Sequence, residues 1–184
     1  MLLMLISEKM LDLIVKAIIF ILPAYFANAA PVLFKTGTSK TPMDYGAKFY
    51  DSRRILGKGK TWTGFFIGII TGTIIGMITW FLGILNIYPT FETHMLVAFL
   101  LSVGTMTGDA VGSFIKRRIN VKSGKSAPII DQLSFYVFAL LFASPYLPKE
   151  FDLIILSILA IITLIVHYLS NIIAYRLKLK SVPW

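Results

Sequence analysis

The chain has 184 residues, of which 57% are hydrophobic and only 15% charged, with a net charge of +9. A soluble domain of this size carries about 25% charged residues, so the composition excludes an ordinary soluble protein. The absence of cysteine excludes disulfides and cysteine metal sites, and His94 and His167 are too far apart for a His-x-x-x-His zinc motif.

The apolar residues fall in long runs, most of which can cross a hydrocarbon core of about 30 Å as a helix. The first run is too long for a cleaved signal peptide and is interpreted as a retained span. The expected fold is an all-α, polytopic membrane protein that forms a single domain over residues 1–184. Its five transmembrane helices are predicted at residues 11–32, 63–85, 93–115, 133–147 and 153–175.

The cations are distributed very unequally between the predicted spans. Fifteen of the 18 Lys and Arg residues lie in the expected loops 33–62 and 116–132 and in the C-terminal tail. Positively charged loops stay on the cytoplasmic side of a membrane. We therefore expect a multi-pass protein of the cell membrane with its N-terminus outside, and with both basic loops and the C-terminus in the cytoplasm.

Glycines recur at every fourth position in two predicted spans, at residues 64, 68, 72 and 76 and again at 104, 108 and 112. Each series forms a smooth stripe along one helix face. Such stripes allow close approach of helix backbones in a membrane, where lipid supplies no hydrophobic drive for association. We predict that these two helices pack tightly, against each other or against a neighbour.

The segment GDAVGSFIKRRINVKSGKSAPIID, residues 108–131, carries the strongest candidate chemistry. Asp109 lies inside a predicted span, where a carboxylate is costly unless it is paired or bound to an ion. Helical spacing places Ser113, Lys116 and Arg117 on the same face as Asp109. The site is therefore either functional or a structural ion pair between Asp109 and one of the two cations.

Asp131 opens the next predicted span, where it could cap the helix or favour its dipole. A short hairpin could instead bring Asp109 and Asp131 to one depth, where two carboxylates would suit Mg²⁺. The cations between them, which include Lys116, Arg117 and Lys125, suit phosphate oxygens. Any one of these cations could also be an ordinary anchor at the cytoplasmic surface.

A second basic loop contains the sequence RRILGKGKTWTG, residues 53–64. Its glycines allow backbone amides to approach a ligand, and Lys58 and Lys60 could contact phosphates. It is not a Walker A loop, because Arg54 stands where that motif needs glycine. Near the end of the first span, Asn28 could hydrogen-bond within the bundle or line a polar cavity.

Three segments resemble the CDP-archaeol synthases, small enzymes of archaeal lipid synthesis: AYFANAAPVLF, LGKGKTWTGFFIG and GDAVGSFIKRRINVKSGKSAPIIDQLSF. The last is also similar to a shortened form of the CDP-diacylglycerol synthase signature. The matching positions are Ser113, Lys116, Arg117, Lys122 or Lys125, Pro128 and Asp131. QLSF stands where the larger enzymes continue with an acidic, glycine-rich run, which leaves open which residues complete a metal site.

The resemblance implies a CTP-dependent nucleotidyltransferase that makes CDP-archaeol and pyrophosphate from CTP and a prenyl-ether glycerol phosphate lipid, with Mg²⁺ as cofactor. In this interpretation Asp109 and Asp131 hold the metal, and Lys116 and Arg117 complete the catalytic set. The expected substrate-binding residues are Asn28, Lys58, Lys60, Ser113, Lys122 and Lys125. No nucleic-acid partner is expected.

Two other classes fit the residues less well. A transporter or channel for an anionic solute would also have basic cavities and intramembrane acids, but the chain has no convincing internal repeat. A scaffold that recruits anionic lipid would not explain a carboxylate inside a span.

Overall fold

The computed structural model describes residues 2–34, 41–84, 87–180 and 182. These residues form five long helices and one short 3₁₀ helix. They are α1 (Leu2–Leu33), α2 (Trp62–Phe81), α3 (Phe91–Arg118), α4 (Pro128–Ala143), η2 (Ser144–Tyr146) and α5 (Leu153–Arg176). Five helical segments are long and apolar enough to cross a membrane, with η2 extending the fourth. The structure therefore confirms the all-α, five-span class.

The observed helix ends differ from the predicted span ends, because a helix need not end where its run of apolar residues ends. α3 continues to Arg118 and α4 begins at Pro128, so the loop expected at residues 116–132 is only 119–127. The cations in the last turn of α3 stabilise the helix, because its C-terminal end carries a partial negative charge. Proline suits the first turn of a helix, where its missing N–H costs nothing.

α2 begins where Thr61 accepts a hydrogen bond of 3.1 Å from the N–H of Gly64. It ends at Phe81, before Gly83, which has a φ of +63°. A helix cannot continue through that left-handed conformation, so α2 stops short of the predicted end. The predicted end itself, residue 85, lies outside the described residues.

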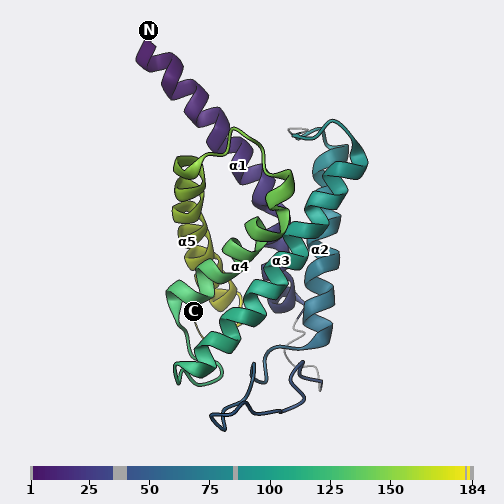
Figure 1. Ribbon diagram of the computed structural model, residues 1–184, viewed down its shortest axis with the longest axis vertical. Coiled ribbons are helices and arrows are strands. Elements are labelled where there is room, and N and C mark those ends of the chain that lie inside the picture. The colour runs from purple at the N-terminus through teal and green to yellow at the C-terminus, as the bar shows by residue number, and fades with distance from the viewer. Residues whose placement is uncertain (1, 35–40, 85–86, 181, 183–184) are drawn as a thin grey trace.

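The two glycine stripes contact different neighbours. A methyl group at Gly72 of α2 would lie 2.5 Å from the carbonyl oxygen of Pro23 in α1, and one at Gly76 would lie 2.2 Å from the Cβ of Ala98 in α3. The α3 stripe instead faces α4, where a methyl group at Gly104 would lie 2.4 Å from the carbonyl oxygen of Phe138. The prediction of tight packing is confirmed, and each stripe lets backbones approach closely (Figure 1).

The apolar core lies where α1 meets α3, α4 and α5. Its largest fully buried apolar side chains are Phe135, Ile21, Leu101 and Leu159, and small alanines of α1 fill the space between them. Large apolar side chains also cover the outer faces of all the long helices, as expected where the solvent is lipid.

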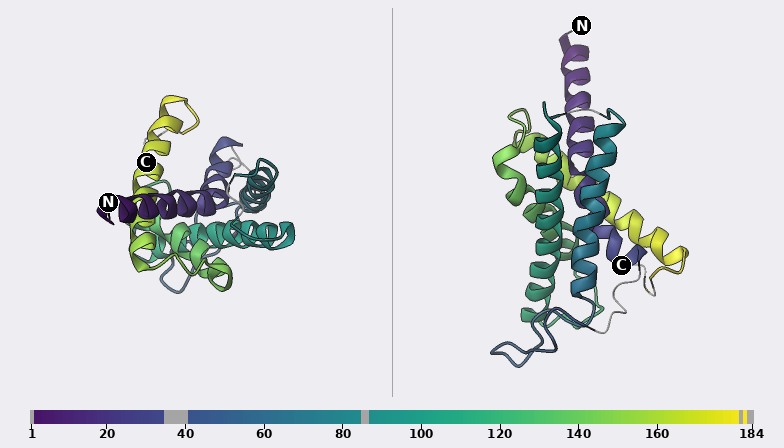
Figure 2. Two further views of the ribbon diagram at one scale, coloured as in Figure 1. Left: turned by 90° about the horizontal axis from the view of Figure 1, so that it is seen from above. Right: turned by 90° about the vertical axis from the view of Figure 1, so that its right-hand side faces the viewer.

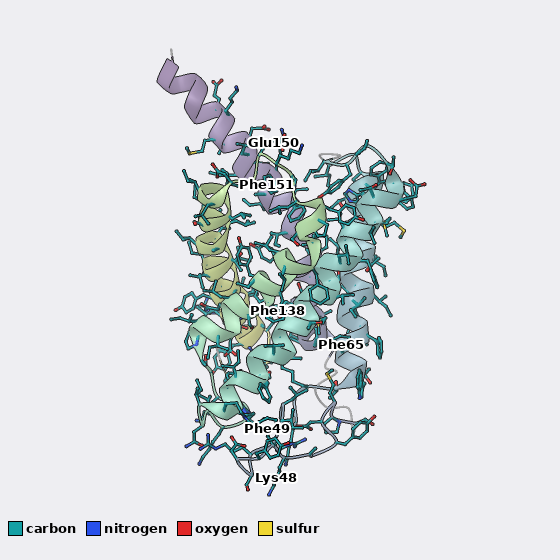
Figure 3. The ribbon with its side chains drawn as sticks, in the orientation of Figure 1. Lys48, Phe49, Phe65, Phe138, Glu150 and Phe151 are labelled. Carbon is teal, nitrogen blue, oxygen red and sulfur yellow. The ribbon has the colours of Figure 1, made fainter. Side chains whose placement is uncertain are left out.

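Both basic segments lie at the same end of the bundle, opposite the N-terminus (Figures 1 and 2). Arg53 Nη1 donates to the carbonyl oxygen of Arg118 at 2.7 Å, and Arg118 forms an ion pair of 3.0 Å with Asp51. The Arg118 guanidinium also lies 4.9 Å from the ring centres of Phe49 and Phe114. Figure 3 shows Lys48 and Phe49 at this end and Glu150 near the other. These contacts join segment 41–61 to the end of α3.

Candidate active site

A cavity of about 1200 Å³ lies between α1, α3, α4 and α5, and both basic segments border it. Among the residues that the structure describes, its charged lining consists of Lys60, Asp109, Lys116, Arg117, Lys125, Asp131, Lys178 and Lys180. The lining residues also include Tyr25, Asn28, Ser113, Gln132, His167 and Asn171. Cations outnumber carboxylates in this set, so the cavity suits a polyanionic ligand.

Asp109 lies on α3 and forms an ion pair with Lys60 of the GKGK segment. The pair that the sequence suggested, with Lys116 or Arg117, is not the one that forms. Lys60 reaches Asp109 because its backbone is fixed: its carbonyl accepts from the N–H of Met43 at 2.8 Å, and its own N–H donates to Gly57 at 3.3 Å. The intramembrane carboxylate thus joins helix α3 to a loop far away in the sequence.

Asp131 lies in the first turn of α4 and uses both carboxylate oxygens. One forms an ion pair with Lys116 of α3, and the other accepts from the N–H of Ala127 at 2.9 Å. The N-cap residue of α4 is Ala127, so the interpretation of Asp131 as an N-cap is wrong. Asp131 lies within the first turn, where a carboxylate interacts favourably with the helix dipole, and it also lines the cavity. The two roles are compatible because a carboxylate has several acceptor positions.

Arg117 and Ser113 are both buried beside this pair. The Arg117 Nε has no hydrogen-bond partner among the described residues, and a buried donor of this kind is costly unless a ligand or water satisfies it. Gly57 packs directly against this region. It has a φ of +117°, and a methyl group there would lie 3.2 Å from Arg117 Nη1 and 3.0 Å from Ser123 Oγ. Glycine is therefore required where the two basic segments meet.

The structure brings most, but not all, of the predicted site residues together. Eight of them line the cavity: Asn28, Lys60, Asp109, Ser113, Lys116, Arg117, Lys125 and Asp131. Asn28 fits both of its interpretations, because it also lies 3.5 Å from Nδ1 of His167. Lys58 and Lys122 are exposed and are not among the lining residues. Each is a loop lysine whose side chain is free to extend into solvent, which sequence spacing does not reveal.

Asp44 organises the GKGK segment, and the sequence analysis missed it. Its fully buried carboxylate accepts from Arg54 at 2.5 Å and from the N–H groups of Gly57, Gly46 and Leu56 at 2.9–3.1 Å. Burial alone would raise the pKa of Asp44, but these hydrogen bonds outweigh burial and hold the pKa well below its usual range. No local pattern distinguishes Asp44, because its partners follow it by two to thirteen residues.

α5 and the tail that follows it supply further polar groups. His167 and Asn171 line the cavity from α5, and Lys180 lines it from the tail. Polar residues in the highly apolar α5 were an available signal, since such residues in a span tend to face a cavity. The position of Lys180 had no such signal, because it depends on how the chain turns after Arg176.

The donor set fits a divalent cation that is shared with a substrate. Among the described residues no group of three or more His, Cys, Asp or Glu could enclose a metal. Mg²⁺ is commonly held by only one or two carboxylates together with substrate phosphates. Asp109 and Asp131, which line one cavity with several cations, provide that combination of ligands.

The fold and site define a multi-pass membrane protein with a polar, cation-rich cavity at one end of its helix bundle. Residues 10–184 match the family described as CarS-like CDP-archaeol synthase. The chain belongs to the CDP-archaeol synthase family, as its sequence motifs indicated.

Individual relatives agree with this assignment. The chain is 47% identical to a CDP-archaeol synthase of Methanocaldococcus jannaschii over 90% of this chain and 94% of the relative. It is 47% identical to one of Pyrococcus horikoshii over 93% and 97%, respectively. A solved structure, described as an intramembrane enzyme for archaeal membrane lipid biosynthesis, matches with a TM-score of 0.72 and 32% identity. That match covers 86% of this chain and 94% of the other.

Proposed function

We propose that this chain transfers CMP from CTP to a prenyl-ether glycerol phosphate in the membrane, giving CDP-archaeol and pyrophosphate. The main support is the similarity to CDP-archaeol synthases over nearly the whole chain, together with a cavity that is lined by both the long helices and the basic loops. The comparisons favour an enzyme over a transporter, because the relatives are named as synthases.

The reaction suits a site built from cations. An oxygen of the lipid phosphate attacks the α-phosphorus of CTP, a new P–O bond forms, and the bond to the leaving pyrophosphate breaks. The nucleophile is already an anion, so no general base is needed. Catalysis then depends on alignment of two anions that repel one another, and on stabilisation of the charge on the leaving group.

The cavity residues divide these tasks. Lys60, Lys116, Arg117 and Lys125 would bind phosphate oxygens, since all four line the cavity. Lys60 and Lys116 have additional N–H donors beyond those used by their carboxylate partners. The unpartnered Nε of Arg117 is a further donor for an anion. Ser113 and Asn28 would supply neutral hydrogen bonds.

Asp109 and Asp131 would hold Mg²⁺, with substrate phosphates completing the coordination. When bound, Mg²⁺ would offset the negative charge of the triphosphate. The presence of both carboxylates in the lining of one cavity supports this assignment.

The site would face the cytoplasm. Support comes from the two basic segments, which lie at one end and border the cavity. CTP would enter from that side, and the lipid from the membrane.

The test is incorporation of radiolabelled CTP into lipid by purified protein in detergent, with Mg²⁺ and a prenyl-ether glycerol phosphate. Asp109→Asn and Asp131→Asn should each lower the rate about 100-fold or more while the protein stays folded. Asp12→Asn is the matched control, because Asp12 is exposed on α1 and pairs with Lys16 at 2.7 Å. Removal of Mg²⁺ with EDTA should stop incorporation, and added Mg²⁺ should restore it. A wild-type protein that labels no lipid would refute the proposal.

A further inference from the structure

The polypeptide turns back toward the bundle where α5 ends (Figure 2). The N–H of Leu179 donates to the carbonyl of Ala174 at 2.9 Å, and that of Lys178 donates to Tyr175 at 3.0 Å. This is the Schellman arrangement, here with Lys178 at a φ of +57° where glycine is usual. The turn directs the residues after it toward the cavity.

Lys180 is the charged residue that this turn delivers. It is half-buried, lines the cavity, and donates from Nζ to Oδ1 of Asn171 at 2.8 Å. The pKa of Lys180 lies below its usual value, and burial is the largest cause. The ammonium groups of Lys60 and Lys116 lower this pKa further, whereas the carboxylates of Asp131 and Asp109 act in the opposite direction. Lys180 is therefore within electrostatic range of both candidate metal ligands and both of their lysine partners.

The carboxylates in this cavity are already engaged. Asp109 pairs with Lys60, and Asp131 pairs with Lys116. An additional half-buried ammonium has a desolvation cost that a neutral amide offsets only in part. Asn171 accepts one of the three N–H donors of Lys180 and fixes its position. The remaining donors and the uncompensated charge favour an anion in the cavity.

We propose that Lys180 binds a substrate phosphate, and that the C-terminal tail thereby forms one wall of the active site. This inference rests on the proposed function. The phosphate belongs either to the triphosphate of CTP or to the lipid, since both present the same oxygens to an ammonium group.

Lys180→Met keeps the aliphatic stem and removes the charge. The kinetic test varies CTP and the lipid phosphate separately, each with the other in excess. We expect the KM for one substrate to rise about 10- to 100-fold, the range for loss of a hydrogen bond to a charged group. Lys180→Arg, which keeps the positive charge, should have a KM close to that of the wild type. The matched control is Arg176→Ala, because Arg176 is an exposed cation on the same helix end and does not line the cavity; its kinetics should equal those of the wild type.

A rise in the KM for CTP alone assigns Lys180 to the triphosphate, and a rise for the lipid alone assigns it to the lipid phosphate. The proposal is overturned if kcat/KM for both substrates stays within about twofold of wild type in folded Lys180→Met. If that variant does not fold, Lys180→Gln takes its place in the same assay. Calorimetric binding of CTP and of the lipid phosphate, without turnover, tests Lys180 independently. A wild type that binds both substrates but forms no product counts against the proposed reaction alone.

Discussion

The contact between α3 and α4 at Gly108 couples packing to the geometry of the site. A methyl group on Gly108 would lie 2.4 Å from the carbonyl oxygen of Ser134 and 2.9 Å from Cα of Phe135. Both are backbone atoms, so no side-chain rotation relieves the clash. The methyl group would also lie 2.7 Å from Cβ of Phe138. Carbon atoms pack at about 3.5–4.0 Å, so this contact requires α4 to move away from α3 by roughly 0.8–1.3 Å.

Gly108→Ala should therefore lower the free energy of unfolding by about 1–3 kcal/mol, the usual range for overpacking. It should also reduce CTP incorporation by about 10- to 100-fold. The reason is that Asp109 follows Gly108 directly, while Asp131 and its Lys116 contact depend on the spacing between the two helices. Thermal unfolding in detergent and the radiolabel assay measure the two effects on one preparation.

Gly112→Ala is the matched control, with the same substitution on the same helix facing the same partner residue. Its methyl group would meet the Ser134 side chain, with Oγ at 2.4 Å and Cβ at 3.0 Å. The hydroxyl can rotate away, so the loss of stability should be smaller than for Gly108→Ala. If Gly108→Ala were as stable and as active as the wild type, α3 and α4 would not be in backbone contact, and this reasoning would fail.

Two further predictions concern the basic end of the bundle. Asp44→Asn should lower the free energy of unfolding by about 1–3 kcal/mol at pH 7, because it leaves the half-buried Arg54 without its counter-ion. The pKa of Asp44 is lowered on folding, so its contribution is fully present above about pH 4 and is lost as the pH falls through the folded pKa. The difference in the free energy of unfolding between wild type and Asp44→Asn should become smaller in acid. A difference that does not depend on pH would contradict this role of the Asp44 carboxylate. The control Asp51→Asn, at a partly exposed ion pair, should lower the free energy of unfolding by less. Since the chain has no cysteine, Ser123→Cys should react with a membrane-impermeant maleimide only in inside-out vesicles, and Lys149→Cys only in right-side-out ones. The reverse pattern would refute the proposed orientation.

The amino-acid sequence by itself determined the features that depend on local composition and period. Runs of apolar residues determined five spans, and glycines four residues apart determined two close-packing helix faces. Charge clustering identified both basic segments, and the motif around Asp109 and Asp131 identified five of the eight charged residues that the structure places in the cavity lining. Each of these properties follows from residues that are near one another in the chain.

Only the tertiary structure decided the pairings between distant segments. Lys60 forms an ion pair with Asp109, Lys116 forms one with Asp131, and the glycine stripe of α3 faces α4 rather than α2. Asp44 and Lys180 acquire their positions through a folded loop and a helix-ending turn, and neither has a distinctive neighbourhood in the sequence. Sequence spacing specifies which residues share a helix face, but the partner of a charge is decided by which helices and loops pack together.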